Sequence, residues 1–128
     1  MSTGTPPRKT LNRAIGALGE NAAQRHLQKL GCRILERNFR CKAGEMDIIA
    51  EQGGTIVFAE VKTRSPRAEF APETAVDGEK QGRLIATARF YLGRYREPSP
   101  HRFDIVSVYL DDRDQVSRIE HFPDAFQP

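Results

Sequence analysis

The sequence predicts an α/β protein in which helices flank a central mixed β-sheet, and three observations carry this prediction. Apolar residues recur at three- and four-residue steps near the N-terminus and again in the second half of the chain, which is typical of helices. Between and after these segments lie short runs rich in Ile and Val, which are typical of strands. The chain has 128 residues, 38% hydrophobic and 29% charged, which fits one globular domain.

The first part of the chain predicts a tail, a helix and a strand. Residues 1–10 are polar, contain two prolines and show no periodicity, so we expect a disordered N-terminal tail before a single domain at 11–128. The first helix is predicted over 11–30, because a glycine suited to a helix end follows it directly. A short strand is predicted over 33–39.

The middle of the chain predicts a hairpin and a loop. Residues 45–51 and 55–62 give the clearest strand signals. Gly53 and Gly54 lie between them, and such a pair favours a two-residue turn. A polar loop with two prolines is expected over 63–73.

The remaining elements are a helix and one or two strands. The second helix is predicted over 77–95, with Asp77 as its N-cap and with an apolar face made of Leu84, Ile85, Ala88, Leu92 and Tyr95. A strand is predicted over 103–110, and a weak one over 119–122. The resulting order is α-β-β-β-α-β.

The predicted hairpin brings charged residues together. A two-residue turn places Asp47 across from Glu60, and Glu45 across from Lys62. Side chains alternate between faces, so these four share one face. The other face is apolar and is expected to pack on the core; it holds Met46, Ile48, Ala50, Val57, Ala59 and Val61.

Two carboxylates that face each other need a reason, since like charges on opposed strands are destabilising. A divalent cation such as Mg²⁺ between Asp47 and Glu60 supplies one, because it binds carboxylate oxygens and keeps water molecules for a phosphate substrate. Lys62 lies two residues beyond Glu60, within reach of such a site. The alternative is an exposed sheet face on which Glu45 and Lys62 form an ordinary ion pair.

The surrounding sequence resembles a known family. Gly44-Glu45-Met46-Asp47, twelve intervening residues and Glu60-Val61-Lys62 resemble the signature of the PD-(D/E)xK, or restriction-endonuclease-like, nuclease superfamily. Gly19-Glu20, Arg37-Asn38 and the segment from Phe58 to Arg64 are similar to the YraN family of small bacterial proteins. Lys80 and Arg102-Phe103-Asp104 fit that family too, so the resemblance covers most of the chain.

The resemblance implies a fold and a set of roles. It implies the restriction-endonuclease-like αβββαβ core, with Asp47, Glu60 and the Val61 carbonyl as ligands of Mg²⁺ or Mn²⁺. It assigns Lys62 to the attacking water, and similarity to archaeal Holliday-junction resolvases adds Glu20 to the catalytic residues. No role for Glu45 follows from it.

Charge adds candidate phosphate contacts. Residues 1–42 contain nine Lys and Arg against two acids, and fifteen of the twenty bases are Arg, which suits a polyanionic partner. Arg64 and Arg67 follow the predicted site, and Lys80 opens the second helix, so these three are candidate nucleic-acid contacts. The three histidines show no metal-ligand spacing; His26 is expected to be partly buried, and His101 and His121 to be on the surface.

The sequence therefore predicts a metal-dependent nuclease acting on DNA, including branched or single-stranded structures. Two alternatives stay open: a nuclease fold that binds nucleic acid without cutting it, and a protein-interaction module. No apolar run approaches the ~20 residues needed to span a bilayer, and the N-terminus has no secretory signal. We expect a cytoplasmic protein with two reduced cysteines and no membrane partner. The sequence does not decide between a monomer and a homodimer.

Overall fold

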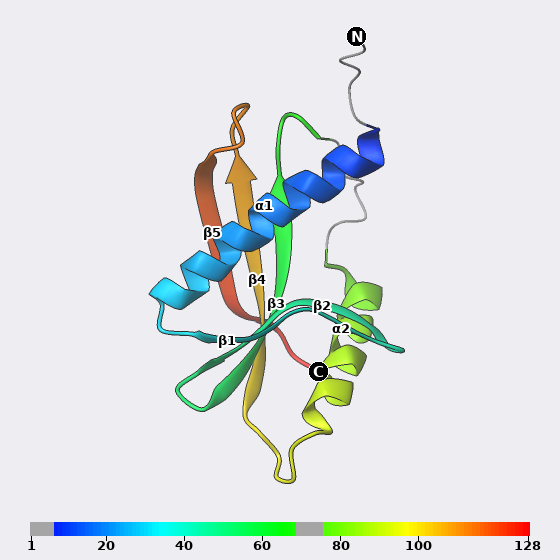
Figure 1. Cartoon of the computed structure of the whole chain (residues 1–128). Helices are drawn as coiled ribbons and strands as arrows, with labels where there is room; N and C mark the ends of the chain where they lie inside the picture. The colour runs from blue at the N-terminus through cyan, green and yellow to red at the C-terminus, as the bar shows by residue number, and fades with distance from the viewer. Residues whose placement is uncertain (1–6, 69–75) are drawn as a thin grey trace.

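The fold is the predicted α/β arrangement. A computed structural model describes residues 7–68 and 76–128 (Figure 1). Its elements, in chain order, are α1 (Arg8–Lys29), β1 (Arg33–Cys41), β2 (Gly44–Gln52), β3 (Thr55–Arg64), α2 (Gly78–Leu92), β4 (His101–Leu110) and β5 (Val116–Phe126).

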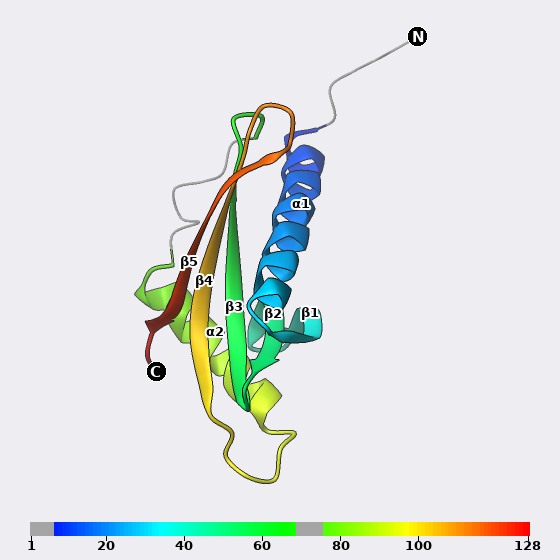
Figure 2. The same ribbon diagram turned by 90° about the vertical axis from the view of Figure 1, so that its left-hand side faces the viewer.

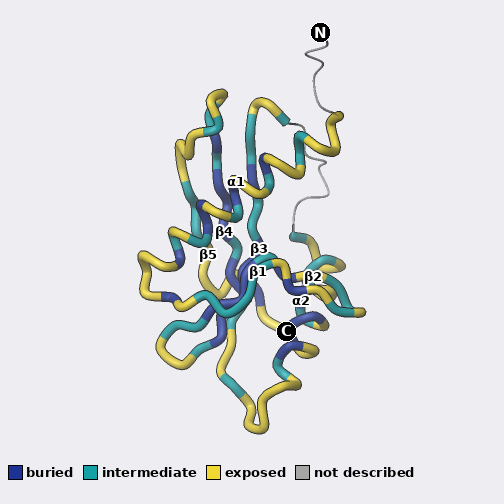
Figure 3. Tube along the Cα trace, viewed as in Figure 1, coloured by how far each residue is buried: buried dark blue, intermediate teal, exposed yellow. Residues whose placement is uncertain are grey.

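The five strands form one sheet in the order β1-β2-β3-β4-β5. All neighbours are antiparallel except β3 and β4, which are parallel and are therefore joined by a crossover that carries α2. Helix α1 covers one face of the sheet and α2 covers the other (Figure 2). Buried segments accordingly gather in the central strands between the helices (Figure 3).

The turn between β2 and β3 has the predicted register. Gly53 and Gly54 have φ angles of 56° and 86°, a conformation that glycine adopts without strain. Cα partners run from Gln52 with Thr55 to Ile48 with Ala59. The hairpin is therefore set by local turn chemistry, as the sequence predicts.

Both faces of the hairpin pack on a core, whereas only one was predicted to do so. Ile48 and Ala59 lie under α1 as expected. Ile49 and Phe58, on the face with the charged residues, are 0% and 1% exposed and pack in the cluster under α2. The charged residues thus lie at the rim of a second core. Met46 also belongs to this second cluster, so its predicted place beside Ile48 was wrong.

The neighbouring strand changes faces beside Met46. Asn38 in β1 has a φ of 53°, a left-handed conformation that interrupts strand alternation. Arg37 consequently contacts α1 through Asn21 and Gln24. Phe39, two residues later, packs in the α2 cluster opposite Met46. Both strands therefore change faces at this point.

Helix boundaries differ from the prediction at both helices. Helix α1 begins at Arg8, so residues 8–10 of the predicted tail are helical, and residues 1–6 lie outside the described residues. In α2, Asp77 is the N-cap as predicted and accepts a hydrogen bond from the Lys80 N–H at 2.9 Å. The helix ends at Leu92 rather than 95, and Tyr91 (3% exposed) rather than Tyr95 (38%) faces the core.

Two further segments differ in extent. Strand β3 runs to Arg64, so the predicted loop over 63–73 begins later, and its residues 69–75 lie outside the described residues. Strand β5 has 11 residues, although only a weak strand over 119–122 was predicted. Its pairing with β4 extends it, and as an edge strand it tolerates Pro123.

Candidate active site

Asp47 and Glu60 meet where β2 separates from β3. The ladder between these strands ends at the pair Ile48–Ala59, one step before the predicted opposition of Asp47 and Glu60. Instead of a backbone partner, the Val61 N–H donates to Asp47 Oδ2 at 2.8 Å. The two carboxyl groups nevertheless interact, since Glu60 contributes both repulsion and a hydrogen bond to Asp47. The structure thus brings this predicted pair together by a side-chain contact.

The environment disfavours the charged form of Asp47. Burial, followed by the neighbouring Glu60 carboxylate, raises its pKa to about 7, against the lowering effect of the Val61 N–H and of Lys80. Glu60 itself is 8% exposed. Two carboxyl groups so placed attract a cation or a proton.

Glu20 reaches the same place from α1. Burial and then the Asp47 carboxylate raise its pKa, while Arg37 and Asn38 lower it. Its Oε1 lies 3.6 Å from Arg37 Nη2. Glu20 is therefore close enough to Asp47 for their charges to interact, and it lines the same hollow as Glu60. Arg37 and Asn38 are additions, and only their place in a family motif hinted at them.

Gly19 explains how α1 comes close enough. A Cβ atom built on Gly19 would lie 1.8 Å from Thr63 Oγ1 of β3 and 2.8 Å from its Cβ. Only a glycine lets the helix backbone approach the strand this closely. The neighbouring Glu20 is thereby held beside β3.

Lys62 lies on β3 two residues beyond Glu60. Its pKa is lowered, mainly because the side chain is partly desolvated and then because Arg64 and Lys80 repel its charge; Glu60 opposes this effect. The sequence alone does not decide the direction of this shift, because burial lowers the pKa of a lysine and nearby carboxylates raise it. In the structure burial and the two cations prevail.

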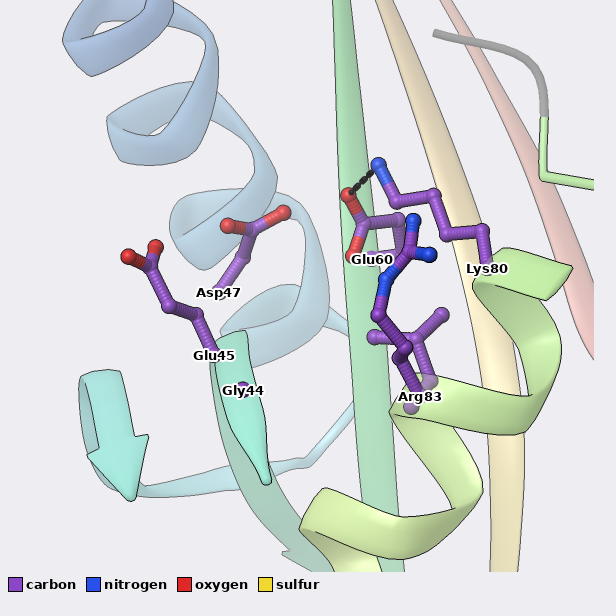
Figure 4. Close-up of a pocket in the computed structure, with 7 residues that line it drawn as sticks. Gly44, Glu45, Asp47, Glu60, Lys80 and Arg83 are labelled. Atoms are coloured by element: carbon purple, nitrogen blue, oxygen red, sulfur yellow. Dashed lines mark ion pairs between the residues drawn. The ribbon is translucent and has the colours of Figure 1, made fainter. Parts of the chain in front are cut away.

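Lys80, one of the candidate nucleic-acid contacts, lies at the candidate site. Its Nζ lies 3.0 Å from Glu60 Oε1, so it reaches this carboxylate from the first turn of α2 (Figure 4). Together with Asp47, Glu60 and Arg83 it lines a hollow of about 300 Å³. Its contact with nucleic acid stays a prediction.

A second, smaller hollow of about 130 Å³ adjoins the first. Glu20, Glu60, Lys62, Arg64 and Lys80 line it. Of the candidate nucleic-acid contacts, Arg64 and Lys80 therefore lie at the site.

Two other predicted neighbours of the site have partners of their own. Arg67 forms an ion pair with Asp114 in the loop after β4. Glu45 lines the larger hollow and forms an ion pair with Arg40 of β1 at 3.3 Å. The ladder between β2 and β3 ends at Ile48 and Ala59, so the predicted opposition of Glu45 and Lys62 was wrong.

Comparison with known proteins agrees with the sequence motifs at these positions. The family model described as "Uncharacterised protein family UPF0102" matches residues 19–108. The chain belongs to the UPF0102 family. The matched segment contains Glu20, Asp47, Glu60, Lys62 and Lys80, and the predicted YraN resemblance is thereby confirmed.

Individual relatives match over nearly their whole length. A UPF0102 protein of Moorella thermoacetica is 47% identical over 115 residues, which cover 89% of this chain and 96% of the relative. A UPF0102 protein of Syntrophus aciditrophicus is 46% identical over 121 residues, covering 94% of both chains. The likeness therefore extends through the strands and both helices.

The donor set of this UPF0102 chain fits a hard divalent cation. Carboxylate and carbonyl oxygens are available from Asp47, Glu60 and Val61, and the repulsion that raises the pKa of Asp47 is what a bound cation relieves. Among residues 7–68 and 76–128, no three His, Cys, Asp or Glu side chains are gathered as a ligand group. Glu60 forms an ion pair with Lys80 instead.

The histidines of this UPF0102 chain form a separate buried chain of contacts. His26 Nε2 lies 3.0 Å from His121 Nδ1, and His121 Nε2 lies 2.7 Å from Asp104 Oδ2. Asp104 is fully buried and also binds Arg102 at 3.0 Å. The side chain of His121 is only 10% exposed, so its predicted surface position was wrong. His26 is partly buried and His101 exposed, as predicted.

No helix in the described part of the chain is long and apolar enough to cross a membrane.

Proposed function

We propose that the chain is a metal-dependent nuclease that hydrolyses the phosphodiester bonds of DNA. The observation that carries the proposal is the contact between Asp47 and Glu60, with Lys62 on the same strand and Glu20 brought in from α1. This combination of two acids and a lysine matches the nuclease signature that the sequence resembles. It also lies at the mouth of two adjoining hollows rather than on a flat sheet face.

The oxygens of Asp47, Glu60 and Val61 are the groups that would hold Mg²⁺ or Mn²⁺. A metal bound there would polarise a phosphoryl oxygen and lower the pKa of a bound water. The chain's own contribution is to present two adjacent carboxylates from a hairpin whose register is fixed by its turn.

The other residues act on the proton and on the phosphate. Because the pKa of Lys62 is lowered, a larger fraction of its side chain is the neutral amine at a given pH. The neutral amine can accept a proton from the attacking water. Arg64, on the same hollow, is suited to grip a phosphate through two parallel hydrogen bonds. Glu20 orients the water through its contact with the carboxylate pair.

The test is a cleavage assay with Mg²⁺ and with Mn²⁺ on single-stranded, duplex, flapped and four-way DNA. Asp47→Asn and Lys62→Ala are expected to abolish cleavage. The matched controls are Asp112→Asn and Lys29→Ala, which alter exposed residues of the same types and should cut as the wild type does. Cleavage that survives Asp47→Asn overturns the proposal.

One observation favours a second candidate, a nuclease fold that binds nucleic acid without cutting it. Lys80 already neutralises Glu60, so an ammonium group fills the role of a cation. This candidate expects DNA binding that persists in EDTA and no cleavage in either metal. Lys80→Ala separates the two: it should leave a nuclease active with a metal, and it should weaken binding by a non-cutting module.

The proposed setting is the cytoplasm, with DNA as the partner. Cys32 and Cys41 are both unpaired, as suits a reducing compartment. Light scattering on the purified protein, with and without DNA, would report whether a homodimer forms.

A further inference from the structure

A third hollow lies next to the candidate active site and belongs to no role discussed so far. It is an open groove of about 540 Å³ on the β4–β5 side of the sheet. Its lining is mostly apolar and consists of Lys62, Ile105, Ser107, His121, Phe122, Pro123 and Ala125. Lys62 lines both this groove and the smaller hollow of the site, so the two lie on either side of one side chain.

Phe122 is the notable member of the groove. It is 47% exposed, although a large aromatic side chain ordinarily buries most of its surface. Strand pairing fixes its place, because Glu60 pairs with Ile105, and Ile105 pairs with Phe122. Glu60 and Phe122 therefore stand in one row across three strands, about 10 Å apart at the backbone.

The neighbouring row has the opposite character. There Lys62 pairs with Ser107, and Ser107 with Glu120. Glu120 is itself bonded to Arg118 at 2.9 Å, so its charge is balanced. A nucleic-acid strand that runs from the carboxylates along this face would therefore meet the ammonium group of Lys62 and the hydroxyl of Ser107, beside the exposed ring of Phe122.

These features together match a nucleotide. Proteins that bind single strands combine cations that follow the phosphates with aromatic rings on which bases stack. A base inside a duplex is stacked on its neighbours and turned away from the protein surface, so it cannot also lie against a ring in a groove. We propose that the groove binds an unpaired nucleobase next to the phosphodiester held at the carboxylates, with Phe122 as its stacking platform.

This inference rests on the proposed function and narrows its substrate to nucleic acid that is single-stranded at the site. Phe122 lies outside the segment 19–108 that the family model matches. It would act as a specificity-determining residue and not in the chemistry. Changing it should therefore affect strand preference and leave the carboxylate pair intact.

The first experiment measures binding of the full chain to a fluorescein-labelled oligothymidylate and to a blunt duplex of equal length, in EDTA so that cleavage does not interfere. Phe122→Ala is expected to weaken single-strand binding about 5- to 100-fold, the range for loss of one stacked base, and to leave duplex binding unchanged. Phe90→Ala, which alters an equally exposed phenylalanine on α2, is the matched control and should bind as the wild type does. An equal effect of both variants, or no effect of Phe122→Ala, overturns the proposal.

A second measurement covers the case in which Phe122→Ala fails to fold. The chain contains no Trp, so Phe122→Trp introduces a single tryptophan, excited selectively at wavelengths that tyrosine does not absorb, that keeps an aromatic ring in the groove. Its emission should be quenched when oligothymidylate is added, and an oligonucleotide of abasic sites should leave it unquenched. The tryptophan introduced by Phe90→Trp should respond to neither. Quenching by the abasic strand to the same extent would contradict base stacking.

The two proposals fail separately. Cleavage lost in Asp47→Asn, together with single-strand binding unaffected by Phe122→Ala, leaves the nuclease and removes the groove's role. A stacking effect without cleavage in either metal leaves the groove and removes the nuclease. A chain that binds neither strand form removes both.

Discussion

Replacing Asp47 by Asn should stabilise the metal-free protein at pH 8. The pKa of Asp47 is raised from 3.8 to about 7 by burial and by Glu60, so the folded state binds its proton more tightly than the unfolded state does. Stability is then fully present below about pH 4 and is lost as the pH rises to about 7. Asparagine removes the charge, and its side-chain carbonyl can still accept the hydrogen bond from Val61.

The magnitude follows from that difference of about three pH units. At 1.36 kcal/mol per unit the upper limit is about 4 kcal/mol. The Asp47 side chain stays partly exposed, so we expect about 2 kcal/mol. For a chain of this size, 2 kcal/mol corresponds to a rise in Tm of about 6–10 °C.

The assay is thermal unfolding of the wild type and of Asp47→Asn in EDTA at pH 8, 6 and 4. The advantage of the variant should shrink as the pH falls and should vanish near pH 4. Added Mg²⁺ should stabilise the wild type by about 2.7 kcal/mol at a hundredfold excess over the Kd, which raises its Tm, and should do little for the variant. Asp112→Asn is the control. An Asp47→Asn protein that is no more stable than the wild type at pH 8 would refute the reasoning.

Three further predictions concern the scaffold around the site. Gly19→Ala should lower the free energy of unfolding by roughly 1–3 kcal/mol, because the added Cβ would overlap Thr63. Gly16→Ala, with open space around it, should be neutral or stabilise the helix by up to about 1 kcal/mol. Urea titration of both variants compares the two effects. Asp104→Ala should cost roughly 3–5 kcal/mol, because it removes a fully buried carboxylate that bonds both Arg102 and His121; a small loss in the same titration would contradict the importance of these contacts. The pKa of His26 is lowered, first by burial, so stability should fall as the pH drops below about 6.5. His26→Gln should make this acid limb shallower in Tm measurements between pH 7 and 5.

Much of the fold follows from local sequence signals. The paired glycines set the register of the hairpin, and Asp77 caps α2. Asp47 and Glu60 each lie two residues from the paired Ile49 and Phe58, so strand alternation predicts both acids on one face. The contact of Asp47 with Glu60 depends on this local geometry, and therefore it was predictable. Glu20 came only from family resemblance, because its place depends on how closely α1 approaches β3.

The features that were missed depend on long-range packing. The strand signal over 33–39 does not show that Asn38 adopts a positive φ, nor that Phe39 and Met46 face α2 together. Nor does the sequence show that Lys80 reaches Glu60, since α2 had first to be placed over β1 and β2. His26 and His121 are 95 residues apart, and only the sheet order brings them together.

The two-glycine turn also has a consequence for the order of folding. A β-hairpin closes within about 1–10 μs, whereas Lys80 joins the site only after the crossover from β3 has docked α2. Asp47 and Glu60 are therefore brought together before their cation partner arrives, and their repulsion falls on the folding transition state rather than on the finished protein alone. Acid or a divalent cation should accordingly speed refolding, because either one removes the repulsion between the two carboxylates at that stage.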